Sequence, residues 1–99
     1  MDSNQNNFSR KEIIIFLIRE ELKIRKVINS ICQAGFNTDV SFDMSPLVFH
    51  FVGIQDTSDE MFEWYYSLLD RYNAEIDLED RDGVNQIADE IYFKLMAKK

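Results

Sequence analysis

The chain has 99 residues, of which 45% are hydrophobic and 13% aromatic, and its formal net charge at pH 7 is −7. A chain of this length usually forms one domain, and this much apolar material can build a core without disulfides or metals, which excludes intrinsic disorder. Because the negative charge repels phosphate backbones and anionic membrane surfaces, we expect no membrane binding and no direct nucleic-acid binding.

The N-terminal residues 1–8 are mostly polar and are expected to form a flexible tail. They lack the basic and apolar regions of a signal peptide. The longest apolar run, 13–18, has six residues, whereas a membrane-spanning helix needs about 20. The single cysteine, Cys32, cannot form an internal disulfide, and its apolar helical context favours burial. We therefore expect a cytoplasmic protein with a single helical domain at 9–99.

The first predicted helix begins after Ser9 and runs to Ala34. Ser9 and Glu12 have the spacing of a capping box, in which each side chain accepts a hydrogen bond from the other residue's amide. Gly35 is placed to adopt the left-handed conformation that ends many helices. Three-and-four spacing predicts that the main apolar face comprises Ile13, Phe16, Leu17, Ile24, Val27, Ile28 and Ile31. Additional apolar residues in the first half of the helix, namely Ile14, Ile15, Ile18 and Leu22, require it to be covered on more than one side.

The segment 37–55 fits two structures. Its alternating apolar residues and its content of β-branched and aromatic residues are typical of strands, which would give a β-hairpin at about 38–54 and an α+β fold. Ser45 followed by Pro46 is instead typical of a helix start, and Gly53 is a suitable helix end. We favour a short helix and keep the hairpin as the alternative.

Two further helices complete the prediction. Thr57 and Glu60 form a second possible capping box, which predicts a long helix beginning there. The last predicted helix opens after residues 80–83 and ends in lysines, where positive charge suits the helix dipole. The sequence thus predicts an all-α domain of three main helices and one short helix, with sequential helices as neighbours.

Catalytic and metal-binding motifs are sparse. His50 is the only histidine and Cys32 the only cysteine, and no motif surrounds either residue, so we expect no enzymatic activity and no cofactor. The acidic turn 77–82 has a partial resemblance to the spacing of a calcium loop. Its weak candidate ligands are Asp77, Glu79, Asp80 and Asp82. A cation-binding or metal-dependent function using this turn is the alternative hypothesis, and an acidic turn that caps a helix is the simpler interpretation.

Aromatic residues indicate an interaction surface. Trp64, Tyr65 and Tyr66 are consecutive, so they spread around most of a helix circumference and cannot all face one small core. Either other helices pack on both sides of this helix and bury these residues, or some of them lie at an interface. Together with Phe93 they are the candidate interface residues, of types that often dominate binding energy. We therefore expect a non-enzymatic protein–protein interaction module: a small adaptor, an inhibitor or a homo-oligomeric domain whose partner is a protein or a second copy.

The distribution of charge fits the same hypothesis. The first predicted helix carries six of the 11 basic residues, whereas the later segments carry most of the acidic ones. Packing between helices explains this asymmetry, and so does a dimer in which the basic helix of one copy meets the acidic turns of another. The sequence does not separate these two explanations.

Overall fold

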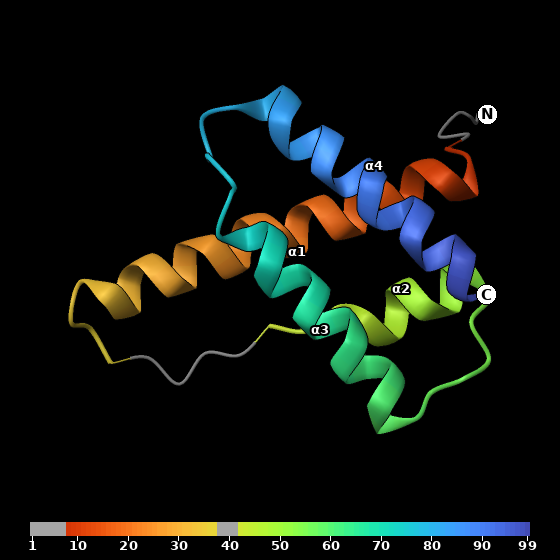
Figure 1. Cartoon of the computed structure of the whole chain (residues 1–99). Coiled ribbons are helices and arrows are strands. Elements are labelled where there is room, and N and C mark those ends of the chain that lie inside the picture. The colour runs from red at the N-terminus through yellow and green to blue at the C-terminus, as the bar shows by residue number, and fades with distance from the viewer. Residues whose placement is uncertain (1–7, 38–41) are drawn as a thin grey trace, which may run out of the picture.

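The computed structural model describes residues 8–37 and 42–99. Within those residues it contains four helices and no strand: α1 (Arg10–Gln33), α2 (Ser45–Val52), α3 (Asp59–Asn73) and α4 (Arg81–Lys98) (Figure 1). The prediction of an all-α fold with three main helices and one short helix is confirmed. The alternative hairpin at 38–54 is wrong because 45–52 is helical, and its first residues, 38–41, lie outside the described residues, as does 1–7 of the predicted tail.

Local hydrogen bonds define both ends of α1 as the sequence predicts. The Glu12 amide donates to the Ser9 hydroxyl at 3.1 Å, and the Ser9 amide donates to the Glu12 carboxylate at 3.0 Å. At the other end Gly35 has a φ of +94°, and the amides of Gly35 and Phe36 donate to the carbonyls of Cys32 and Ile31. This is the paired bonding of a Schellman motif.

The starts of α2 and α3 differ by one residue from the prediction. Ser45 is the first residue of α2 rather than its cap, and its amide donates to the Asp43 carboxylate at 2.9 Å. Ser58 rather than Thr57 caps α3, accepting a hydrogen bond from the Met61 amide at 3.3 Å. In both places an aspartate two residues upstream of a serine binds the serine amide, and this local turn sets where the helix begins.

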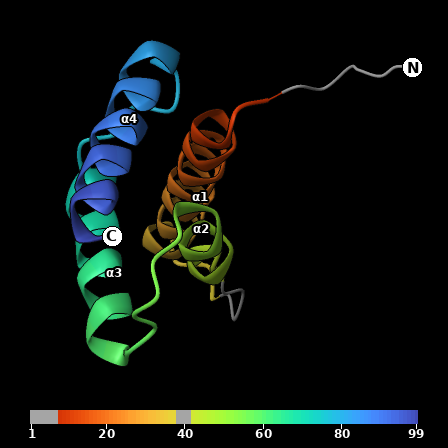
Figure 2. The same cartoon turned by 90° about the vertical axis from the view of Figure 1, so that its right-hand side faces the viewer.

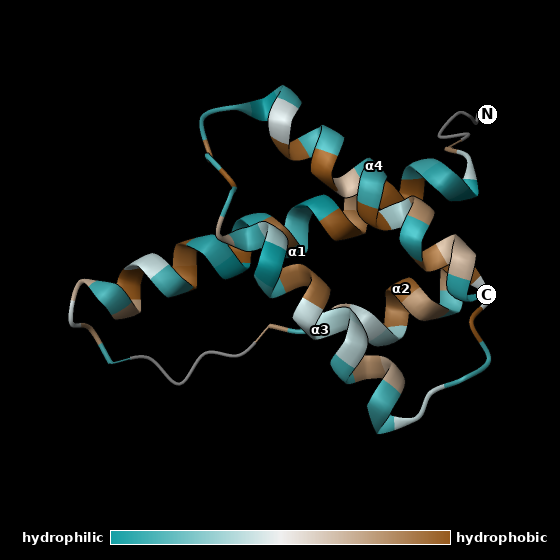
Figure 3. Cartoon of the chain, in the orientation of Figure 1, coloured by the Kyte–Doolittle hydropathy of each residue, from teal (hydrophilic) through white to brown (hydrophobic). Residues whose placement is uncertain are grey.

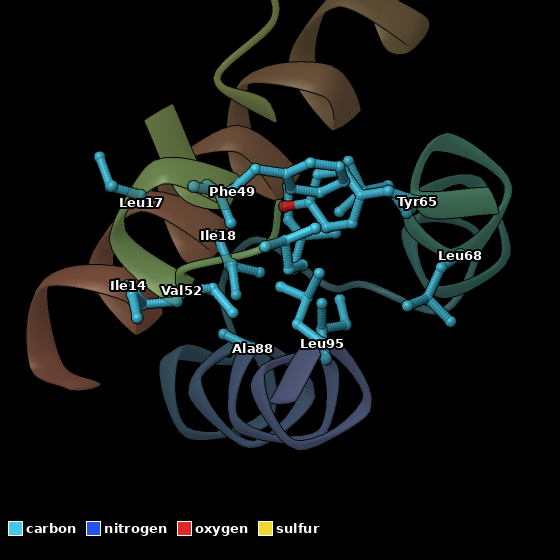
Figure 4. Close-up of a cluster of buried hydrophobic side chains, with 14 of the residues drawn as sticks. Ile14, Leu17, Ile18, Phe49, Val52, Tyr65, Leu68, Ala88 and Leu95 are labelled. Atoms are coloured by element: carbon cyan, nitrogen blue, oxygen red, sulfur yellow. The ribbon is translucent and has the colours of Figure 1, made fainter. Parts of the chain in front are cut away.

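The helices form two layers, with α1 and α2 in one layer and α3 and α4 in the other (Figure 2). One cluster of buried side chains fills the space between them, including Ile18, Phe49, Tyr65, Ala88 and Leu95 (Figure 4). The Phe49 ring stacks on Phe62 at a centroid distance of 4.6 Å and meets Tyr65 edge-on at 5.5 Å. These contacts join α2 to α3, while the α4 residues close the core from the other end.

The core uses a different face of α1 from the one predicted. Its buried residues are Ile14, Leu17, Ile18, Glu21 and Leu22. In contrast, Phe16, Val27 and Ile31 of the predicted face are 50%, 45% and 41% exposed. Because α3 and α4 form a layer on one side of α1 (Figure 2), only the residues directed toward that layer and toward α2 are covered. Cys32, predicted to be buried, is also exposed, since the last turns of α1 extend beyond the other helices (Figure 1).

Removing the hydroxyl group of Tyr65 and removing that of Tyr66 should have opposite effects on the free energy of unfolding. The Tyr65 hydroxyl is buried and has no hydrogen-bond partner in the described part of the chain, whereas the Tyr66 hydroxyl donates to Asp43 at 2.6 Å. We expect Tyr65→Phe to raise the free energy of unfolding by about 1 kcal/mol and Tyr66→Phe to lower it by about 1 kcal/mol. Urea unfolding followed by circular dichroism measures both, and a clear loss of stability in Tyr65→Phe would contradict this.

Candidate interaction surface

The four candidate cation ligands of the acidic turn have local roles in the structure. Asp77 accepts a hydrogen bond from the Glu79 amide at 3.0 Å, and Asp80 accepts one from the Gly83 amide at 3.0 Å as the N-cap of α4. Asp82 lies in the first turn of that helix. Among residues 8–37 and 42–99, no three His, Cys, Asp or Glu side chains gather closely enough to hold a metal ion. These carboxylates act locally, because each that accepts a bond does so from its own turn.

The four predicted interface aromatics lie in different environments. Tyr65 has an exposed fraction of 0%, so its assignment to an interface is wrong: it reaches across the core from α3 (Figure 4). Tyr66 and Trp64 are half-buried, the first bonded to Asp43 and the second covered by the Lys98 ammonium at 4.9 Å from its ring centroid. Phe93 is 58% exposed on α4. Only Phe93 of this group presents most of its surface to a partner.

A buried carboxylate joins α1 to the start of α2. Glu21 is fully buried, and its Oε2 accepts hydrogen bonds from the Arg25 side chain at 3.1 Å and from the Met44 amide at 3.4 Å. Its other oxygen has no hydrogen-bond partner in the described segments. Burial raises the pKa of Glu21, and the adjacent Arg25 guanidinium only partly offsets that effect. The Glu21 contacts hold two elements together at the cost of burying a charge.

A polar pocket of about 390 Å³ lies beside this contact and is lined by Arg25, Asp43, Tyr66 and Asp70, among others. Burial raises the pKa of Asp43, but hydrogen bonds from Ser45 and Tyr66 outweigh it, so the net shift is downward. Arg25 also lies 3.9 Å from the Asp70 carboxylate and over the Tyr66 ring. Because these groups bind one another, we interpret the pocket wall as a structural network.

Exposed apolar side chains gather along α1. Of the nine exposed large hydrophobic residues among the described residues, five lie on this helix or directly beside its ends. We call this set the open face of α1; its members, exposed by 41% to 68%, are Phe8, Phe16, Val27, Ile31 and Phe36. Spacings of eleven and four residues place Phe16, Val27 and Ile31 on one side of the helix. Hydrophobic bands mark the part of α1 that extends beyond the bundle (Figure 3).

A groove adjoins the N-terminal half of the open face. It has a volume of about 650 Å³, and its apolar wall is formed by Phe8, Ile13, Ile15 and Phe16. Glu12, Arg19 and Asn85 also line it, and the Arg19 guanidinium lies 3.3 Å from the Asn85 side-chain oxygen. The groove is therefore an apolar hollow beside an exposed aromatic ring, which is a common shape for a protein-binding surface.

Several of the six basic residues of α1 contact residues of α3 or α4. Arg25 approaches Asp70 on α3, Lys11 lies 3.9 Å from Asp89 on α4, and Lys26 donates to the Asn73 carbonyl at 3.3 Å. The charge asymmetry of the sequence thus contributes to packing between helices.

The sequence shows that the residues of the open face are apolar but does not show that they are exposed. Val27 and Ile31 lie in the apolar stripe that the sequence predicts to face the core. Three-and-four spacing shows which residues share a side of the helix but not which side is covered. The usable signal was the width of the apolar surface of this helix, which one small core cannot cover.

Removal of the Glu21 charge should change how stability depends on pH. Because the folded-state pKa of Glu21 is raised above 4.5, its charged form opposes folding, and this penalty grows as the pH rises above 4.5. We expect Glu21→Gln to be more stable than the wild type at pH 7, with a difference that disappears below pH 4.5. Urea unfolding across pH tests this, with the exposed Glu63→Gln as control; a variant less stable at pH 7 would contradict it.

Comparisons with known proteins do not suggest a function for this chain. The chain was compared with family models, with curated proteins and with solved structures, and none of them matches it. No helix in the described residues has the length and apolar content required to cross a bilayer.

Proposed function

We propose that this protein is a non-enzymatic protein–protein interaction module and that it binds its partner through the open face of α1. One observation carries the proposal: five of nine exposed large hydrophobic side chains gather on a single helix and its ends. Isolated exposed apolar residues are ordinary, whereas several along one side of a helix are typical of a surface that another protein covers.

The composition of the surface supports binding rather than catalysis. Phe8, Phe16 and Phe36 are aromatic and Val27 and Ile31 are β-branched, so the open face offers apolar area rather than acid–base or nucleophilic groups. Aromatic side chains bury a large area at a small entropic cost, which is why they are enriched in interfaces. Phe93 on α4 is the alternative anchor, because it is exposed but lies apart from this set.

Paired variants test which surface binds. We expect Phe16→Ser combined with Val27→Ser to reduce partner capture by at least about tenfold, because hot-spot side chains dominate interface energy. Phe93→Ser, a matched aromatic change on α4, should leave capture unchanged. The measurement is cross-linking of the tagged protein in its own cells, followed by quantitative mass spectrometry that counts untagged copies of the chain as well as other proteins.

Thermal unfolding provides the folding control for this experiment. All three substituted residues are at least 45% exposed, so their replacement should leave the melting temperature within a few degrees of the wild type. Equal capture by the α1 variant and the wild type would refute the proposed surface. Loss of capture in Phe93→Ser alone would move the binding site to α4.

A further inference from the structure

We propose that the partner of the open face is a second copy of this chain, with the two α1 helices packed antiparallel. This inference rests on the proposed function and specifies its partner. It follows from how the residues of the open face are placed about the middle of the helix, from the charges at its centre and from the groove beside it.

The sequence of the open face is nearly symmetric about the midpoint of α1. The helix runs from Arg10 to Gln33, so its midpoint falls between residues 21 and 22. Antiparallel pairing about that point places Phe16 of one copy opposite Val27 of the other. It also brings Phe8 of one copy close to Phe36 of the other. Apolar side chains thus meet toward both ends of the contact, while the charged Glu20 and Lys23 lie at its centre.

Charge complementarity selects the antiparallel orientation. Glu20 and Lys23 lie near the centre, with side-chain exposures of 29% and 46%. Within one copy the Glu20 carboxylate lies 3.4 Å from the Lys23 ammonium and 3.3 Å from the Arg19 guanidinium. Antiparallel pairing about the midpoint puts Glu20 of each copy opposite Lys23 of the other. Parallel pairing in register would put Glu20 against Glu20 and Lys23 against Lys23, and facing like charges disfavour helix association.

The groove gives the second copy a place to pack. Its apolar wall contains Phe16 and Ile13. In the antiparallel register, Val27 of the other copy lies opposite Phe16 and faces the apolar wall of the groove. Ile31 lies opposite Glu12, which also lines the groove. Insertion of side chains into such a hollow is the usual way in which helices pack.

The size of the contact predicts a reversible dimer. A helix of 24 residues is about 36 Å long, and with a diameter of about 10 Å it presents a narrow strip. Stable interfaces bury about 800 Å² on each partner, whereas the projected area of this strip is about 360 Å², well below that value. We therefore expect self-association in the micromolar range rather than a permanent dimer.

Sedimentation velocity on the purified chain, from low micromolar to submillimolar concentration, is the test. The wild type should pass from monomer to dimer, and Phe16→Ser should remain monomeric while Phe93→Ser dimerises normally. Glu20→Lys and Lys23→Glu should each weaken dimerisation by about tenfold, and the double exchange should restore it, because each single change makes like charges face each other. Glu63→Lys, which makes the same charge change on an exposed site of α3, should have no effect.

The outcomes separate this inference from the proposed function. A wild-type chain that stays monomeric at every concentration refutes the second copy as partner. The open face remains the proposed binding surface if its variants no longer capture a different protein in cells. A dimer that forms normally in the α1 variants but dissociates in Phe93→Ser refutes both this inference and the proposed binding surface. Single charge variants that dimerise as well as the wild type refute the antiparallel register.

Discussion

Burial of one face of α1 is the constraint on which the rest of this structure depends. This helix contacts each of the other three, and its buried residues face the core that they form. Specific polar contacts fix how the partners sit: the buried Asn73 side chain of α3 donates to the Leu22 carbonyl at 2.9 Å, and Glu21 accepts a bond from the Met44 amide just before α2. Apolar burial provides the driving force, and these bonds select one arrangement.

The position of α1 in the fold also explains why one of its apolar sides is exposed. With α3 and α4 on one side of α1, its opposite side is left to solvent together with Phe16, Val27 and Ile31. Covering that side inside the chain would need another element, and the described residues supply none. Association is the physical alternative, because it removes the exposed apolar area from water. The fold and the proposed function therefore arise from one feature, a helix with more apolar surface than its own domain buries.

Three consecutive aromatic residues of α3 lie in three different environments. Tyr65 enters the core, Tyr66 bonds Asp43 near the start of α2, and Trp64 lies under the Lys98 ammonium near the end of α4. Each successive residue turns by about 100° around the helix, so neighbours in sequence meet different elements. These three aromatic residues therefore mainly make contacts within the chain. The exposed aromatic residues are Phe8, Phe16, Phe36 and Phe93, which lie outside α3.

Features that depend on residues three to five positions apart could be predicted from the sequence alone. The all-α fold, the capping box of Ser9 and Glu12 and the endings at Gly35 and Gly53 belong to this group, because their hydrogen bonds are local. The exposure of Val27 and Ile31 and the dispersal of the acidic turn could not be predicted in this way. Periodicity shows which residues share a side of a helix, but only the placement of distant helices decides which side is covered.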